Sequence, residues 1–160
     1  MRKNSLLASL LVVVAVGGFG VSSRAAGAAG PVKEPAKIVV TTSPDATAAG
    51  AESHVTLQLT PAPGIKINKY PKIQLKVAAQ DGLVGAAAAA IGNSEPPPPD
   101  QIEGNYFKTV DPVELKLPIA ASATPGKHDV AAQLVYYYCV AASGFCAPAK
   151  VPVSIPITVR

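Results

Sequence analysis

The chain is 160 residues long with a formal net charge of +4, a length that suits one domain and not two. The excess positive charge lies near the start, because 11 basic and 10 acidic side chains remain without residues 1–28. Such a balance lacks the clustered basic footprint of nucleic-acid-binding proteins. The nearest basic group, Lys66, Lys69, Lys72 and Lys76, is interpreted as solvated edge lysines, which block sheet-to-sheet aggregation. We therefore expect no nucleic-acid partner.

Residues 1–28 have the pattern of a signal peptide. Arg2 and Lys3 give a positive start, residues 6–21 form an apolar run, and Ala26-Gly27-Ala28 fits a cleavage site. The alternative is an uncleaved membrane anchor, although the run is short for that role. We expect an exported protein, periplasmic or secreted, that does not span the membrane once the signal is removed.

The remainder divides into a flexible N-terminal segment, residues 29–50, with one early strand at 37–42, and a domain at residues 51–160. Within the domain, apolar and polar residues alternate with period two, which is typical of half-buried strands. The clear alternating segments are residues 54–60, 72–77, 113–119, 130–139 and 151–159, and a weaker one spans 102–109.

About seven strands separated by proline and glycine turns predict an all-β fold, an immunoglobulin-like antiparallel β-sandwich. Stacking two sheets buries the apolar face of each. Pro152 and Pro156 cannot donate ladder hydrogen bonds, so the last strand is expected at a sheet edge. The chain has no tryptophan, which argues against an antibody-type domain.

Residues 85–100 interrupt the alternation. Ala86 to Ala90 suggest a helical turn, whereas Pro96 to Pro99 favour an extended, stiff segment. Long irregular loops are usually either functional or disordered. Two interpretations therefore stay open for this stretch: a disordered linker, or a cover over a functional site.

Cys139 and Cys146 are the only cysteines, and they flank a turn at Ser143-Gly144. An even cysteine count in an exported protein predicts a disulfide, and two cysteines allow one pairing. This bond has two interpretations that the residues alone do not separate. One is an inert structural staple, and the other is an exchanging dithiol, which needs accessible sulfur and a perturbed thiol pKa.

The hairpin resembles the cysteine hairpin in the N-terminal periplasmic domain of DsbD-type thiol:disulfide interchange proteins. The resemblance covers about residues 50–160 and rests on three motifs. The first is the hairpin itself. The second is a Pro-Gly-x-x-Ile-Asn segment followed by a proline, and the third is a Tyr-Phe pair before a strand ending Leu-Pro-Ile. The matching residues are Tyr137, Cys139, Gly144, Phe145, Cys146 and Pro148, then 63–68 with Pro71, and Tyr106-Phe107 with 117–119.

The resemblance implies that Cys139 and Cys146 are the redox pair of a periplasmic electron relay, a component of a protein-disulfide reductase. It implies two kinds of partner: a membrane-embedded electron donor and thioredoxin-like periplasmic proteins. Because no electron carrier or thioredoxin-like domain is present in these 160 residues, the reductant is expected on a separate protein. Two further departures are a hairpin one residue longer than usual and Ile65 in place of an aromatic residue.

The resemblance also implies a loop that caps the cysteines, with Glu103, Tyr106 and Phe107 as candidate cap residues. The alternative for Tyr106 and Phe107 is that they begin a strand and pack in the core. His54 and His128 form no close-spaced metal motif with the cysteines, and no nucleophile or phosphate-binding motif occurs. We expect no metal and no cofactor. The competing function is an exported binding or structural module with an inert disulfide.

Overall fold

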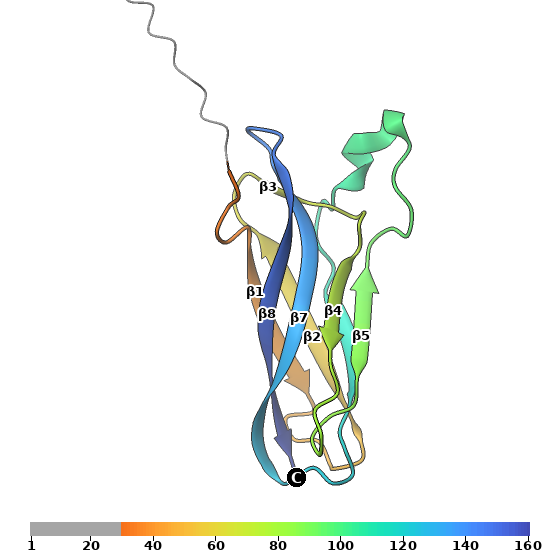
Figure 1. Cartoon of the computed structure of the whole chain (residues 1–160), viewed down its shortest axis with the longest axis vertical. Coiled ribbons are helices and arrows are strands. Elements are labelled where there is room, and N and C mark those ends of the chain that lie inside the picture. Colours follow the sequence, from red (N-terminus) through yellow and green to blue (C-terminus); the bar gives the residue numbers. More distant parts are fainter. Residues whose placement is uncertain (1–29) are drawn as a thin grey trace, which may run out of the picture.

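The computed structural model describes residues 30–160, so the expected signal peptide at 1–28 lies outside the described residues. Figure 1 shows two antiparallel sheets stacked as a sandwich, with the strands of both sheets running roughly along the vertical axis of the view. The all-β, immunoglobulin-like prediction is confirmed.

Within residues 30–160, eight strands form the two sheets. The three-stranded sheet has the order β1-β2-β6, with β1 at Ala36–Ser43, β2 at Glu52–Pro61 and β6 at Val113–Pro118. The second sheet is organised around the long strand β7, which pairs with β8 along one side and with β3 and β4 along the other, and β5 lies outside β4. Its bounds are β3 Ile65–Ile67, β4 Ile73–Val77, β5 Ala87–Ile91, β7 Gly126–Val140 and β8 Cys146–Val159.

Period-two alternation sets which side chains fill the sandwich. Each clear alternating segment became a strand, and its apolar set faces the other sheet because successive side chains point to opposite faces. The largest fully buried side chains come from both sheets, namely Leu57, Leu59, Ile73, Leu75, Leu117, Leu134, Tyr136, Tyr138 and Ile155. A register shift by one residue would expose such a set, so burial fixes the pairing.

Strand β8 lies at the edge of its sheet, as its prolines predict. It pairs with β7 from Cys146 to Val159, and its other side makes a single bridge with the described part of the chain, between Thr47 and Val159. Backbone amides alternate between the two sides of a strand, and Pro152 and Pro156 fall on the side facing away from β7. The free edge of β8 therefore lacks a backbone N–H donor at Pro152 and at Pro156, which discourages pairing with another chain.

Three local expectations differ from the structure. Residues 86–90 are not a helical turn, because Ala87–Ile91 form β5 against β4. The weak strand at 102–109 is wrong, since Pro99–Asn105 form a 3₁₀ helix, η1, for which a proline in the first turn is suited. The early strand expected at 37–42 is confirmed as β1. Because β1 pairs with β2 along its whole length, however, the sandwich begins before residue 51.

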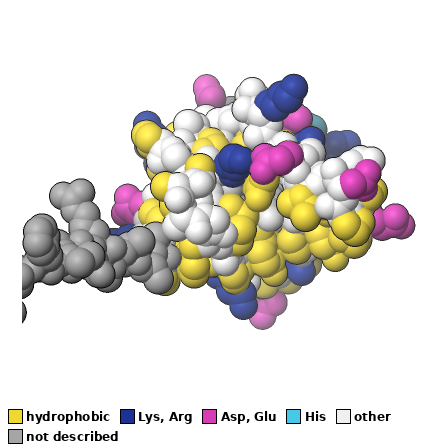
Figure 2. All heavy atoms as spheres, turned by 90° about the horizontal axis from the view of Figure 1, so that it is seen from above, with side chains coloured by type: hydrophobic (Ala, Val, Ile, Leu, Met, Phe, Trp, Pro, Cys, Tyr) yellow, Lys and Arg dark blue, Asp and Glu magenta, His cyan; other side chains and the backbone are white. Residues whose placement is uncertain are grey.

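The β7–β8 turn and η1 lie at the same end of the sandwich, opposite the C-terminus (Figure 1). Figure 2 looks down on this end and shows hydrophobic side chains reaching the surface, with acidic and basic groups interspersed rather than gathered by sign. The cysteines and the irregular loop, which are far apart in sequence, are therefore at one end of the fold.

Candidate functional site: the disulfide and its cover

Cys139 and Cys146 form a disulfide at the end of the β7–β8 hairpin. They are the last of a continuous series of opposed pairs that begins with Gly126 and Val159. Their Cα atoms lie 4.1 Å apart, near the ~4.5 Å of a pair without mutual backbone hydrogen bonds, where side chains approach most closely. The hairpin register alone therefore brings the two sulfurs together.

The two cysteines differ sharply in exposure. Cys146 is exposed, whereas Cys139 is only 3% exposed. Cys139 lies on the outer face of β7, because its neighbours Tyr138 and Tyr136 point into the core. A residue on the outer face of a sheet is buried only when another part of the chain covers it.

The cover over Cys139 comes from the segment after η1. The Tyr106 hydroxyl donates to Cys139 Sγ at 3.6 Å, and Asn68 Oδ1 lies 3.5 Å from the same sulfur. Tyr106 is held by a bridge with Asn68, and the next amide, that of Phe107, donates to Ile67 O at 3.0 Å. One sulfur is thus enclosed by an aromatic ring and an amide while its partner faces solvent.

The candidate cap residues occupy three different environments. Tyr106 contacts the disulfide, as the cap interpretation requires. Phe107 packs against the hydrophobic core, as the alternative interpretation requires. Glu103 does not reach the sulfurs; its carboxylate pairs with Lys66 Nζ at 3.0 Å.

Lys66 connects the two halves of the site. It lies on β3 directly opposite Cys139 on β7, and its Nζ lies 4.7 Å from the centroid of the Tyr106 ring. That distance is within the ~6 Å over which a cation is attracted to an aromatic face. The same ammonium therefore contacts both Glu103 of η1 and the aromatic cover of the sulfur.

Asn105 fixes the C-terminal end of η1 to the segment after β3. Its Oδ1 accepts from Tyr70 N at 2.9 Å and its Nδ2 donates to Tyr70 O at 2.9 Å. The Asn105 carbonyl also accepts from Lys69 N, and the side chain is 8% exposed. These hydrogen bonds take the place of the ladder bonds that a strand would have made. They also fix the position of the backbone immediately before Tyr106.

Sequence reasoning did not single out Lys66, Asn68 or Asn105 as site residues. The sequence favours a solvated edge position for Lys66, and Asn68 is notable there only as the last residue of a motif. The sequence feature that could have indicated Lys66 is its position in a short alternating run, Ile65 to Ile67, two residues before Asn68 of the second motif. No pattern in the sequence indicates that Asn105 reaches Tyr70.

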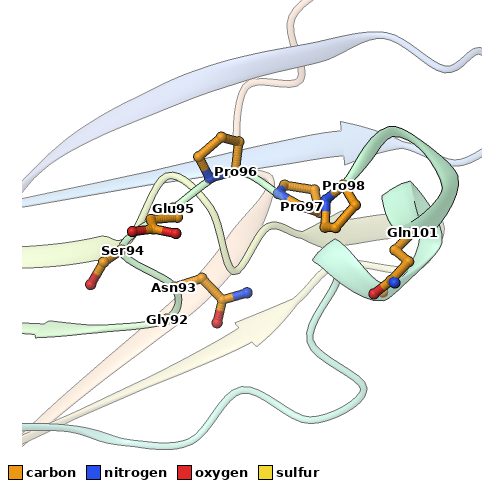
Figure 3. A pocket seen from close by; sticks show the side chains of 9 residues that line it. Gly92, Asn93, Ser94, Glu95, Pro96, Pro97, Pro98 and Gln101 are labelled. Carbon is orange, nitrogen blue, oxygen red and sulfur yellow. The ribbon is translucent and has the colours of Figure 1, made fainter.

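A hollow of about 500 Å³ adjoins η1. Figure 3 shows its wall of three consecutive prolines, with the Asn93 and Gln101 amides on the opposite sides of the opening. It is lined by residues 92–98 with Gln101 and Gly104. Among the described residues that line it, Glu95 is the single titratable side chain, so the hollow holds no pair of titratable groups for acid–base chemistry. The disulfide is the candidate site at this end of the sandwich.

Within residues 30–160, no cluster of three or more histidine, cysteine or acidic side chains is placed to hold a metal ion. No helix among those residues is long and apolar enough to cross a membrane. The chain matches no protein-family model and no curated protein.

Proposed function

We propose that this protein is a thiol–disulfide exchange module, with Cys139 and Cys146 as its redox pair. The observation that carries the proposal is the unequal exposure of the two sulfurs: Cys146 is open to a partner, and Cys139 is covered by Tyr106. A bond that served only as a staple would need no such cover. Exchange also requires access to one particular sulfur, and the hairpin tip provides it.

The geometry supports attack at Cys146. A thiolate of a reduced partner attacks Cys146 Sγ, the disulfide breaks, and its electron pair leaves on Cys139 Sγ as a thiolate. The partner is then joined to Cys146 as a mixed disulfide. The partner's second thiol then attacks the partner sulfur that is bonded to Cys146 in the mixed disulfide, and Cys146 is released. The partner is oxidised to a disulfide, and this chain has gained two electrons. One proton comes from the partner's second thiol, and solvent returns the proton that the attacking thiol released on ionising.

The return step runs through the same atoms in reverse. The Cys146 thiolate attacks the disulfide of an oxidised acceptor, and Cys139 resolves the mixed disulfide. The DsbD-like motifs favour a membrane-embedded donor and thioredoxin-like periplasmic acceptors as the two partners. An exported location accords with both the signal-like N-terminus and the disulfide, which persists in oxidising compartments.

The competing proposal is an inert staple in a binding or structural module. The bond closes a short loop between strands that are already paired. In the loop-entropy description, such a short loop contributes only about 2–3 kcal/mol. A staple at this place would thus add little that the ladder does not already fix.

The reduction potential distinguishes the two functions. We expect a value above about −300 mV, because structural disulfides generally lie below it. Equilibration of the full chain with dithiothreitol and glutathione buffers, followed by alkylation, measures it. A potential well below that value, together with no reduction by thioredoxin-like proteins, leaves the staple as the function.

Single-cysteine variants test the direction of attack. In Cys139→Ser, the remaining Cys146 thiol should react with an aromatic disulfide reagent at least about tenfold faster than the remaining Cys139 thiol does in Cys146→Ser, since access governs exchange. Equal rates in two folded variants would contradict the assignment of Cys146 as the attacked sulfur.

A further inference from the structure

Breaking the disulfide creates a negative charge where the protein is nearly closed to water. Attack at Cys146 leaves the electron pair on Cys139, which is 3% exposed. Burial disfavours a thiolate, and a leaving thiol of lower pKa leaves faster. A positive group close to Cys139 therefore favours exchange, because it can stabilise the thiolate where water has little access.

Lys66 is the basic residue placed to supply that charge. It is directly opposed to Cys139 across the β3–β7 pairing, and directly opposed side chains have Cβ atoms about 5 Å apart on one face of a sheet. Its ammonium also lies over the Tyr106 ring, whose hydroxyl donates to Cys139 Sγ. A cation against the ring makes that hydroxyl a stronger donor.

Glu103 competes for the same ammonium. The Lys66–Glu103 ion pair is 3.0 Å long, but the Glu103 side chain is 85% exposed. An ion pair so open to water is weak, so little is lost when the lysine turns toward a new charge on the sulfur. In the disulfide form, Glu103 is the partner that occupies Lys66.

We propose that Lys66 is a positioning residue for exchange: its charge, delivered through space and through Tyr106, stabilises the Cys139 thiolate, while Glu103 opposes it. This inference rests on the proposed exchange chemistry and assigns roles to the half-buried Lys66 and the exposed Glu103, neither of which bears sulfur. It also gives the aromatic cover a chemical purpose beyond shielding, because the hydroxyl is the group that reaches the leaving sulfur.

The other titratable groups around Cys139 are accounted for. Tyr137 is two residues away on the same face of β7, Cys146 is its disulfide partner, and Lys69 directs its Nζ to Gly104 O at 3.0 Å. None of these brings a free positive charge to the sulfur. Lys150 on β8 lies opposite Val135, two opposed positions beyond Pro148. Among the described residues, Lys66 is therefore the lysine that is both directly opposed to Cys139 and in contact with its cover.

The test is a pH titration of the Cys139 thiol in the full chain carrying Cys146→Ser. The thiolate is monitored by its absorbance near 240 nm. Lys66→Met should lower the thiolate fraction at a fixed pH about tenfold, one pKa unit, the low end of what an adjacent opposite charge produces. Lys66→Gln should do the same, and Lys66→Arg should preserve the original value. Glu103→Gln should shift the pKa the other way, to more thiolate.

The opposite signs separate charge from structure. Both Lys66→Met and Glu103→Gln break the same ion pair, so a purely structural role moves the pKa in one direction for both. The matched control is Lys76→Met, which removes an outward lysine of the same sheet, on β4 opposite Gln133, and should leave the titration unchanged. Shifts of one sign in both variants, or equal effects at Lys66 and Lys76, would overturn the proposal.

The titration needs no redox partner, so its result is independent of the relay. A potential typical of a structural disulfide together with the opposite shifts would refute the relay and keep the charge assignment. A reduction potential typical of a relay, together with no change in the Cys139 pKa in Lys66→Met, would support the relay and refute the charge assignment.

Discussion

Tyr136 and Tyr138 are two buried tyrosines on β7 that allow a sharp test of the core. Both rings are almost fully enclosed. The Tyr138 hydroxyl accepts a hydrogen bond from Val32 N at 3.0 Å. The Tyr136 hydroxyl has no hydrogen-bond partner among the described residues. Removing the two hydroxyl groups should therefore change the free energy of unfolding in opposite directions.

The expected magnitudes follow from hydrogen-bond energetics. A buried polar group without a partner costs about 1–3 kcal/mol, so Tyr136→Phe should stabilise the protein by about 1 kcal/mol at pH 7. A net hydrogen bond contributes about 1 kcal/mol, so Tyr138→Phe should destabilise it by about that amount, because Val32 N loses its acceptor. For a domain of this size, either change shifts Tm by about 2–8 °C.

The pH dependence provides a second signature. Burial, with a smaller contribution from the nearby Tyr138, raises the pKa of Tyr136 from 10.0 to about 12. A group whose pKa is raised on folding contributes stability that is intact below its unfolded pKa and is lost as pH rises toward its folded pKa. The wild type should thus lose stability between pH 10 and 12, by roughly 3 kcal/mol in all.

Urea unfolding of the three proteins at pH 7 and pH 11 measures both effects. At pH 11 the wild type has lost roughly 1 kcal/mol through Tyr136, whereas Tyr136→Phe has not. The advantage of Tyr136→Phe should therefore grow from about 1 to roughly 2 kcal/mol. A destabilised Tyr136→Phe, or an advantage that does not change with pH, would refute the assignment of an unpartnered hydroxyl.

Two further predictions concern the last strand and the cover. Val153→Asn should cost about 3 kcal/mol because it buries an amide without partners, whereas the adjacent, outward Ser154→Asn should stay within about 0.5 kcal/mol; similar melting temperatures would show the β8 register to be misassigned. In the Cys146→Ser protein, Tyr106→Ala should speed alkylation of the Cys139 thiolate at least about tenfold at a pH where the thiol is fully ionised, since access limits the reaction. Phe107→Ala should leave that rate unchanged and cost about 2 kcal/mol, less than for a fully buried ring, and the reverse pattern would exchange the two roles.

The strands of the sandwich were predictable because their signal is local. Alternation of apolar and polar residues marks a half-buried strand wherever it occurs, and the set from Val153 to Val159 faces inward as its sequence indicates. The edge position of β8 was equally accessible, since each proline removes a donor without regard to the rest of the fold. The disulfide pairing needed only a count of two cysteines and their places beside a turn.

The irregular regions were not predictable in the same way. The segment at residues 87–91, four alanines followed by Ile91, has no alternation and weak strand preference, and it became β5 only because β4 offered an unpaired edge. Residues 99–105 formed η1 rather than a strand because Asn105 satisfies the backbone of Tyr70. Both outcomes depend on partners that lie ten or more residues away in the chain.

The sequence by itself determined that Cys139 and Cys146 sit on one hairpin and on the outer face of a sheet, because turn position and period-two geometry are local properties. Only the tertiary structure decided that one sulfur is covered and the other open. That difference arises where β3, β7 and the segment after η1 meet, bringing Lys66 and Tyr106 to Cys139 across 73 and 33 residues of chain. Burial and electrostatics at such a junction are set by which chain segments pack together, and no local pattern encodes them.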